Sequence, residues 1–383
     1  MAEPAVRRLS RLLVALPSTR MGGTERHTAA LCTHLAGRGL AVTLAAEPAL
    51  HDALRPHLGP GVALEAAAIG PEAAGADANE ARQAAEGARL IAGHAPDMAL
   101  LPLPWPDAGL GLMRALAAAG LPRVVLAHLA DDGPVPAAVA AARGAIGASG
   151  CALAAVSAPT AFRIARAFGV PAARVAVLPN PAPAPAALDR AMVRATMRSS
   201  FGLAPEAGLV LFVGRLEEAK GADLLPAVSG RLGAVLACLG DGPLRGLLEA
   251  RAADDPRGLL RVIGPVADAG TWYLAADALL LPSRREGAPL VFLEAAAHRC
   301  PVVATEAALE ALDDRMFDLA RIAEAEPGAL AAALEGVLAD PAGTAGMVEA
   351  AAAHAARQDW DLAVERMLGL LRAACMAVGD RAA

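Results

Sequence analysis

Two carboxylates lie eight residues apart in the stretch "SRREGAPLVFLEAAAHRCPVVAT", which spans residues 283–305. Glu286 follows two arginines, whereas Glu294 sits in an otherwise apolar block. Burying an unpaired carboxylate is costly, so Glu294 needs hydrogen-bonding partners. A pair of hydroxyls such as a ribose diol would satisfy it. The structural alternative is an ion pair between Glu294 and an arginine elsewhere in the chain.

A helix is expected to begin inside this stretch, because Pro289 suits the first turn, where its missing N–H would be unpaired anyway. On one continuous helix the two carboxylates would be separated by about 80° and would not share a face. Glu286 is therefore expected in the loop and Glu294 in the second turn, bracketing a ligand over the helix N-terminus. Free N–H groups there would face phosphates. The residues expected around this helix start are Gly287, Ala288, Pro289 and Leu290.

Two cations occur in the loop "GRLEEAKGAD", which follows the apolar run "LVLFV". Arg215 can fork onto two oxygens and Lys220 is a mobile point charge, a combination that suits a diphosphate. Both are expected beside the electropositive start of a helix. Alternatively, Glu217 and Glu218 pair with them in an ordinary surface salt-bridge cluster.

The first half of the chain offers two weaker candidates. Gly22 and Gly23, in "PSTRMGGTER", would let the backbone approach an anion at the start of a helix, or they form an ordinary glycine turn. His128 ends the run "RVVLAH" and could meet a substrate by hydrogen bonding or proton transfer. A lone histidine is also often structural.

The elements that must position these residues alternate between short β-rich runs and helical segments, which predicts parallel sheets built from βαβ units. Ligands of such sheets bind beyond the carboxyl ends of the strands, and the candidate residues follow expected strands. The expected strands are 11–16, 41–46, 98–103, 123–128, 152–157 and 174–179, then 209–215, 234–240, 261–264, 278–284 and 301–305. The expected helices are 24–36, 79–93, 107–119, 159–168, 222–231, 243–252 and 289–299.

A chain of 383 residues is long for one core, so two domains are expected. The segment "NPAPAPAALD" is rich in proline and reads as a stiff linker. The last segment, "WDLAVERMLGLLRAACMAV", is amphipathic and forms a helix of its own. The expected organisation is a Rossmann-like domain at 1–182, a linker at 183–189, a second Rossmann-like domain at 190–355, and a terminal helix within 356–383.

Composition excludes several classes of protein. A net charge of −6 argues against general affinity for nucleic acid. Five scattered cysteines without a CxxC or Cys/His cluster argue against a zinc site or a disulfide framework and favour reduced thiols in the cytoplasm. No long run of large apolar residues predicts a transmembrane helix. Arg7, Arg8 and Arg11 form either a solvated edge or a peripheral contact with the inner face of the membrane.

Together these motifs resemble the retaining glycosyltransferases of family 4 (glycosyl transferases group 1). The resemblance rests on "MGGTE", His128, "VSAPTAFRIARAFGVPAARVAVLPNP", "LFVGRLEEAKGADLL", "CLGDGPLRGLLE" and the opening stretch. It implies the α/β GT-B fold: two doubly wound Rossmann-like parallel-sheet domains facing a cleft, with a C-terminal helix crossing back to the first domain. It also implies a nucleotide-sugar donor, a UDP- or GDP-sugar, and a glycan, lipid or small-molecule acceptor. Neither a metal nor a cofactor is implied.

The resemblance assigns a role to each candidate in the second domain. Arg215 and Lys220 would neutralise the diphosphate, Glu294 would hold the ribose hydroxyls and Glu286 would contact the transferred sugar. Amides from Gly287 to Leu290 would surround the sugar and the phosphate.

In the first domain, the resemblance implies that His128 contacts the sugar across the cleft, and that Gly22 and Gly23 approach the phosphate and the acceptor. The chain departs from the family pattern at two positions. After Thr305 the segment "EAALEALDD" replaces a glycine-rich turn, and Arg299 stands where a glycine commonly ends the preceding helix. Arg299 should therefore cost some stability.

Two other functions fit the same architecture. A non-hydrolysing nucleotide-sugar epimerase would use acid and base residues in the cleft and would not need the Arg215–Lys220 pair. A catalytically degenerate relative would bind a nucleotide-sugar or a partner enzyme without turnover. The presence of all four charged candidates favours transfer.

Overall fold

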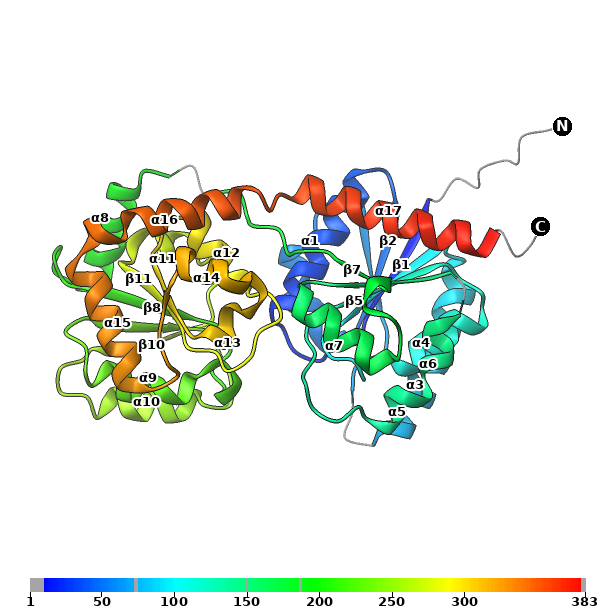
Figure 1. Cartoon of the computed structure of the whole chain (residues 1–383), viewed down its shortest axis with the longest axis horizontal. Coiled ribbons are helices and arrows are strands. Elements are labelled where there is room, and N and C mark those ends of the chain that lie inside the picture. Colours follow the sequence, from blue (N-terminus) through cyan, green and yellow to red (C-terminus); the bar gives the residue numbers. More distant parts are fainter. Residues whose placement is uncertain (1–9, 72–74, 149, 186–187, 380–383) are drawn as a thin grey trace. The chain divides into compact units, whose positions relative to one another are not determined.

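The structure, a computed structural model, describes residues 10–71, 75–148, 150–185 and 188–379. Two predicted features lie partly outside these ranges. They are the linker, at residues 186–187, and the basic edge or membrane contact, at Arg7 and Arg8. The chain folds into two compact units, which are drawn in Figure 1. Unit 1 comprises Met1–Asn180 together with Trp360–Ala383, and unit 2 comprises Pro181–Asp359.

Unit 1 is built on a seven-stranded parallel sheet with the order β3-β2-β1-β4-β5-β6-β7. The change of direction between β1 and β4 is the switch point of a doubly wound fold. The prediction missed β3, an edge strand whose side chains are mostly half-exposed, because "VALEA" lacks the dense apolar run of the central strands. The strands are β1 Arg11–Leu16, β2 Ala41–Ala46, β3 Val62–Ala66, β4 Met98–Leu103, β5 Arg123–Ala127, β6 Cys151–Ala155 and β7 Val175–Val177.

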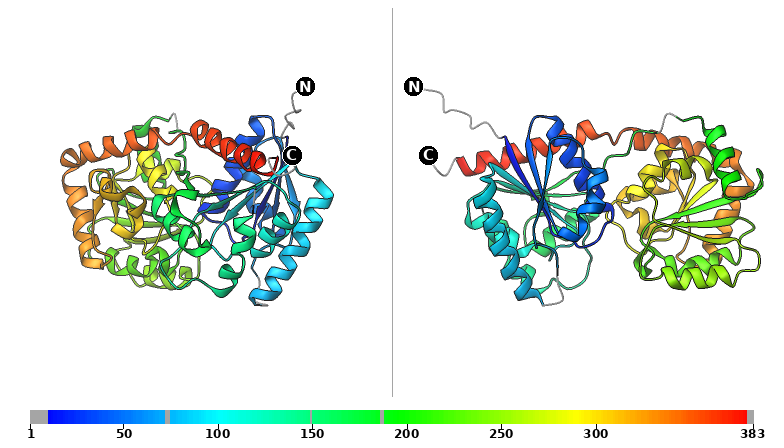
Figure 2. Two further views of the ribbon diagram at one scale, coloured as in Figure 1. Left: turned by 45° about the vertical axis from the view of Figure 1, so that its right-hand side comes forward. Right: turned by 180° about the vertical axis from the view of Figure 1, so that it is seen from behind.

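Helices cover both faces of this sheet. Helix α1 packs against α17 on one side, whereas α3 packs against α4, and α4 against α6, on the other (Figure 2). The helices are α1 Gly23–Gly37, α2 His51–Leu54, α3 Ala76–His94, α4 Leu110–Ala118, α5 Ala137–Ala141, α6 Arg143–Gly147, α7 Ala158–Phe168 and α17 Trp360–Gly379. Short 3-10 turns occupy Pro48–Leu50, Arg55–His57 and Ala172–Arg174.

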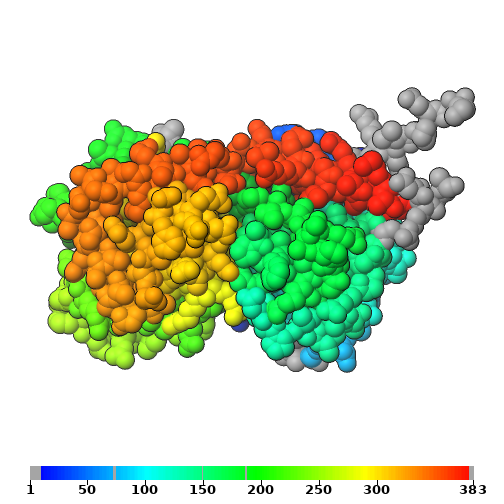
Figure 3. All heavy atoms as spheres, in the orientation of Figure 1, coloured from blue at the N-terminus to red at the C-terminus, as the bar shows by residue number. Residues whose placement is uncertain are grey.

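Helix α17 belongs to unit 1 although it follows unit 2 in the sequence, which confirms the predicted return of the chain. Its buried side contacts α1, β5 and β6. Arg38, after α1, holds its first turns through ion pairs with Asp361, at 2.7 Å, and with Glu365. The outward side of α17 (red) lies at the molecular surface in Figure 3.

Unit 2 is built on a six-stranded parallel sheet with the order β10-β9-β8-β11-β12-β13. Successive side chains of β8 enter different cores, as a strand buried on both faces requires. Leu209 and Leu211 pack toward α11 and α12, and Val210 and Phe212 toward α9 and α15. The strands are β8 Leu209–Val213, β9 Val235–Leu239, β10 Leu260–Gly264, β11 Ala278–Leu281, β12 Val302–Ala304 and β13 Arg321–Ile322.

The helices of unit 2 differ more from the prediction. The prediction of a helix at 222–231 is wrong at its start, because α9 begins only at Leu225. Before it, two 3-10 turns, η4 Glu218–Lys220 and η5 Ala222–Leu224, flank Gly221, whose φ of +72° is left-handed. The alanine-rich helices α15 and α16 were not predicted because alanine gives little periodic contrast. The helices are α8 Arg190–Ser200, α9 Leu225–Ser229, α10 Arg245–Ala253, α11 Gly270–Ala275, α12 Leu290–Ala297, α13 Glu306–Leu309, α14 Met316–Leu319, α15 Pro327–Ala339 and α16 Pro341–Ala356, with a 3-10 segment η6 at Glu310–Arg315.

Arg299 ends α12 in the left-handed conformation, with φ +51°. Its N–H bonds to Ala296 O at 3.0 Å and that of Cys300 to Ala295 O at 2.9 Å, the hydrogen bonds of a Schellman motif. The guanidinium pairs with Glu349 at the surface. The position that a glycine would favour is thus occupied by a strained arginine.

Replacing Arg299 by glycine should relieve this strain. We expect Arg299→Gly to be more stable than Arg299→Ala by about 1 kcal/mol, because both lose the pair with Glu349 but only glycine adopts φ > 0 freely. Urea unfolding of the two variants tests this. Equal stabilities would show that the left-handed turn is not strained.

Within the described residues, no helix combines the length and the apolar character needed to cross a membrane.

Candidate active site

The candidate site of unit 2 is formed by loops that leave the carboxyl ends of its central strands. The loops after β8 and β9 are joined by backbone hydrogen bonds: Leu216 N–H bonds to Asp241 O at 2.9 Å, and Leu244 N–H to Leu216 O at 2.9 Å. Gly240 has φ +138°, and a Cβ there would lie 1.9 Å from Gly214 O. Only glycine allows these two loops to approach so closely.

Lys220 and Glu286, predicted separately, form an ion pair in the structure. Lys220 Nζ lies 2.6 Å from Glu286 Oε1, and both side chains are largely withdrawn from solvent. Lys220 is also the only lysine among the 383 residues of the sequence, in which every other basic side chain that stays charged is an arginine. The only side-chain ammonium of the sequence therefore lies in the loop that is predicted to bind a diphosphate.

The turn that carries Lys220 is clamped to the loop that carries Glu286. Arg284 makes two hydrogen bonds of 2.7 Å with the carboxylate of Asp223, and its backbone N–H bonds to Ala219 O at 2.9 Å. Beneath them Gly221 packs so closely that a Cβ would lie 2.3 Å from Pro282 O. The spacing between cation and carboxylate is thus fixed by backbone contact.

Ser283 is a site residue that the sequence analysis did not single out. It is fully buried just after β11, and its Oγ donates to Glu286 Oε1 at 2.8 Å. Thr305 Oγ1 donates to Ser283 O at 2.5 Å and also accepts from Ala308 N–H, capping α13. The segment that replaces a glycine-rich turn is therefore a short capped helix connected to the Glu286 loop.

Glu294 lies in the second turn of α12, as predicted, and its Oε2 accepts a hydrogen bond of 2.9 Å from Tyr273. Tyr273, the sole tyrosine of the sequence, is buried in α11. This hydroxyl accounts for a carboxylate on an otherwise apolar helix. The signal that could have identified Tyr273 is its position in the helix directly before β11.

Arg215 follows β8 and is partly exposed, with its Nη2 atom 2.9 Å from Glu217. This contact is the one that the salt-bridge alternative predicted. The other predicted acidic partner, Glu218, instead accepts a hydrogen bond from Arg284 through its carbonyl. The two cations are therefore not held alike: Arg215 pairs with a neighbour in sequence, and Lys220 with another candidate site residue.

The start of α12 differs slightly from the prediction. Pro289 is the cap residue, in an extended conformation, and Leu290 is the first residue of the helix. The correction is one residue and arises because the proline ring fixes φ but leaves ψ free to be extended. Gly287 and Ala288 precede it, so that the chain from Glu286 leads directly to the first helical N–H groups, which have no acceptor within a helix.

In unit 1, His128 directly follows β5 and is buried beside His27 of α1, with their ring centroids 5.0 Å apart. His27 in turn stacks on Trp360, the first residue of α17. Within the described parts of the chain, His128 Nε2 and His27 Nδ1 have no hydrogen-bond partner. Burial lowers the pKa of His27 to about 4, and burial with His27 nearby lowers the pKa of His128 well below its usual value. Both rings are neutral at pH 7, so His128 can hydrogen-bond a hydroxyl but does not supply positive charge.

This depressed pKa predicts that unit 1 loses stability in mild acid. Below pH 6.5 His27 takes up a proton in the unfolded chain, while the folded ring stays neutral until about pH 4. Stability is therefore complete above pH 6.5, and we expect His27 alone to remove about 2 kcal/mol of it between pH 7.5 and pH 5. Hydrogen exchange of the β5 amides at the two pH values measures this. His27→Phe keeps a ring for stacking and should lose less stability on acidification; an unchanged pH dependence would contradict the prediction.

Gly22 and Gly23 form the start of α1, one residue earlier than predicted. Gly22 is the cap residue, in an extended conformation with φ −165°, and its carbonyl accepts from Arg26 N–H at 3.1 Å. The φ angle at position 22 is open to any residue and therefore does not require a glycine. The open start of a 15-residue helix and the buried histidines lie in the same unit.

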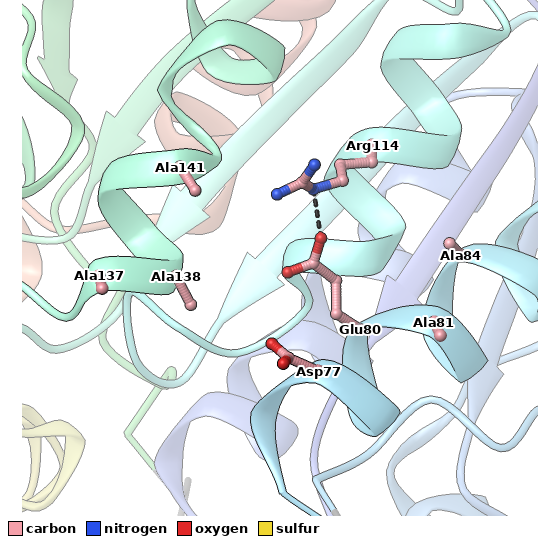
Figure 4. A pocket seen from close by; sticks show the side chains of 8 residues that line it. All are labelled: Asp77, Glu80, Ala81, Ala84, Arg114, Ala137, Ala138 and Ala141. Atoms are coloured by element: carbon pink, nitrogen blue, oxygen red, sulfur yellow. Dashed lines mark ion pairs between the residues drawn. The ribbon is translucent and has the colours of Figure 1, made fainter.

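A pocket of about 470 Å³ also opens in unit 1, between α3, α4 and α5. Figure 4 shows Arg114 reaching from α4 to Glu80 of α3, with which it forms an ion pair, and Asp77 nearby. The other lining residues are alanines. None of the predicted site residues lines this pocket.

The structure thus brings the predicted residues together in two groups. Lys220 and Glu286 pair in unit 2, where a short stretch of chain links Glu286 to the start of α12, and the loops from Gly22 and His128 lie in unit 1. Tyr273 and Ser283 complete the first group, and His27 the second.

Two protein-family models match the chain, one for each half. A model described as Glycosyltransferase Family 4 matches residues 21–183, and one described as Glycosyl transferases group 1 matches residues 207–340. Together they include all of the predicted site residues.

Among curated proteins, a D-inositol 3-phosphate glycosyltransferase of Catenulispora acidiphila is 35% identical over 187 residues, covering 43% of this chain and 42% of the relative. Another from Kineococcus radiotolerans is 32% identical over 244 residues, covering 56% and 55%. The chain thus matches about half the length of these relatives.

Solved structures match over nearly the whole chain. A glycosyltransferase from Rickettsia africae has a TM-score of 0.76 with 14% identity, covering 96% of this chain and 99% of that one. Anabaena HepE in complex with UDP has a TM-score of 0.74 with 18% identity, covering 94% and 99%. At such identities the likeness establishes the fold, which is GT-B.

Proposed function

Because the chain belongs to the glycosyltransferases, family 4 in its first half and group 1 in its second, we propose that it transfers a sugar from a nucleotide-sugar donor with retention of configuration. The observation that carries this proposal is the joined set of Lys220, Glu286 and the α12 N-terminus. It presents a cation, a carboxylate and backbone donors on adjoining loops, as a sugar diphosphate requires.

The chemistry breaks the bond between the anomeric carbon and the diphosphate oxygen while negative charge builds on the diphosphate. Lys220, Arg215 and the α12 amides would stabilise that charge, the largest expected contribution to rate. The departing phosphate oxygen would help remove the acceptor's proton on the same face of the sugar. Glu286 would then bind a sugar hydroxyl rather than form a covalent intermediate.

The remaining candidates would hold the ends of the donor. Glu294, oriented by Tyr273, would accept hydrogen bonds from the ribose hydroxyls. Neutral His128 would hydrogen-bond the transferred sugar, and the chain at Gly22 and Gly23 would approach the phosphate and the acceptor. No bound metal or cofactor is needed for these steps.

The structural neighbour that binds UDP supports a uridine nucleotide as the first donor to test. The names of the relatives support a polyol phosphate, D-inositol 3-phosphate, among candidate acceptors that otherwise include glycans and lipids. From the sequence we also propose that the protein is located in the cytoplasm. A peripheral contact with the inner face of the membrane, through Arg7, Arg8 and Arg11, is a further proposal from the sequence.

A thermal-shift panel of UDP-, GDP- and ADP-sugars, followed by measurement of slow donor hydrolysis and of transfer to D-inositol 3-phosphate, tests this function. We expect at least one nucleotide-sugar to stabilise the protein and to be turned over. If a nucleotide-sugar stabilises the protein but is not turned over with any acceptor, the catalytically degenerate alternative is favoured. If no nucleotide-sugar stabilises the protein, the proposed donor site is refuted.

A further inference from the structure

One carboxylate oxygen of the site accepts hydrogen bonds from two groups of different mobility. Glu286 Oε1 accepts from Lys220 Nζ at 2.6 Å and from Ser283 Oγ at 2.8 Å. The lysine ammonium ends a flexible stem of four carbons, whereas the serine hydroxyl is one bond from Cβ.

Ser283 is itself fixed by its surroundings. Its side chain is completely buried, directly after β11 and Pro282. Its carbonyl accepts a hydrogen bond of 2.5 Å from the buried Thr305, which caps α13. The hydroxyl of Ser283 is therefore a donor held in place by two neighbouring strand ends.

These two hydrogen bonds are expected to respond differently when a nucleotide-sugar binds. An ammonium that neutralises a diphosphate shifts its charge away from Glu286, which then loses one of its two hydrogen bonds. Without a second anchor, a carboxylate tends to follow the cation, because the two charges attract each other. With the anchor, it stays where it can accept a hydrogen bond from a sugar hydroxyl.

We propose that Ser283 is a positioning residue for Glu286, holding Oε1 so that the carboxylate stays in place for the sugar while Lys220 turns to the diphosphate. This inference rests on the proposed function and deepens it. The hydrogen bond from Ser283 would allow Lys220 to bind the diphosphate without displacing Glu286 from the sugar. With the Lys220–Glu286 ion pair alone, diphosphate binding and sugar recognition would be linked.

The test compares Ser283→Ala with Ser229→Ala. Ser229 is also buried in unit 2, but its hydroxyl has no partner within the described residues, so its removal is a matched control. The probes are UDP and UDP-glucose, or the GDP or ADP pair if the wild type prefers it. We measure the Kd of each and the kcat of donor hydrolysis, and we check folding by thermal denaturation.

For Ser283→Ala we expect the Kd of the free nucleotide to stay within about twofold, whereas kcat falls by about 100-fold through misplacement of Glu286. The advantage of the sugar nucleotide over the free nucleotide should shrink as well. Ser229→Ala should match the wild type in all three. If Ser283→Ala does not fold, Thr305→Val, which removes the hydrogen bond to Ser283 O, should show the same selective loss in weaker form.

Unchanged kcat, or an equal loss of affinity for both ligands, would overturn the role of Ser283 while leaving the donor site intact. If the wild type binds no nucleotide, the proposed function fails first, and the inference fails with it. The two failures are thus distinguishable from the wild-type titration alone.

Discussion

Replacing Lys220 by alanine should lower kcat/KM by about 1,000-fold, because it removes one of the two cations proposed to stabilise the charge that develops on the diphosphate. It also leaves Glu286 without its ionic partner. Lys220→Arg should stay at least about tenfold below the wild type, since a planar guanidinium does not replace a point charge against one carboxylate oxygen. Calorimetric titration with UDP and measurement of donor hydrolysis would give the loss in binding and in turnover.

Arg251→Ala provides the control for this series. Arg251 lies exposed on α10 in the same unit, and it belongs to none of the site contacts. It should retain wild-type activity. An alanine at 220 that keeps more than half of the activity would refute the phosphate role of the lysine and leave the salt bridge with Glu286 as a structural contact.

Gly221→Ala should disrupt the donor site through the backbone. A Cβ at 221 would lie 2.3 Å from Pro282 O, in a left-handed conformation that disfavours alanine. The strain and the overpacking together should cost about 3 kcal/mol of stability in unit 2. The Lys220 turn should also move away from the Glu286 loop and weaken UDP binding.

Gly233→Ala is the matched substitution. Gly233 does not have a positive φ, and a Cβ there meets nothing within 4 Å, so its stability should change by less than about 0.5 kcal/mol. Urea unfolding, with hydrogen exchange of the β11 and α12 amides and UDP titration, compares the two. Equal effects of the two alanines would show that close packing at 221 does not hold the site.

Much of the fold follows from local pattern because the central strands are short apolar runs bounded by turns. β1 was predicted to the residue, and β8 and β11 were found, but their predicted carboxyl ends ran too far, to Arg215 and Arg284. The edge strands β3 and β13 were missed. Edge strands pair on one side only, so their sequences need less apolar character.

The candidate site was predicted unevenly, for a physical reason. Glu286, Lys220 and Glu294 are charged residues in unusual settings, so the sequence exposes them. Ser283 and Tyr273 are ordinary residues whose importance depends on the atom they face, and this depends on tertiary packing. His27 illustrates the same limit: one turn of α1 places it against a histidine that lies about 100 residues away in the chain.

The solitary lysine gives this protein a natural reporter. Besides the chain terminus, Lys220 carries the only aliphatic amine in the sequence, so that reductive methylation with carbon-13 would label one side chain in 383 residues. Its methyl resonance would shift when the partner of the ammonium changes from Glu286 to a phosphate. A single peak in a two-dimensional spectrum could therefore follow, in solution and without a mutation, the exchange of partners on which the proposed donor site depends.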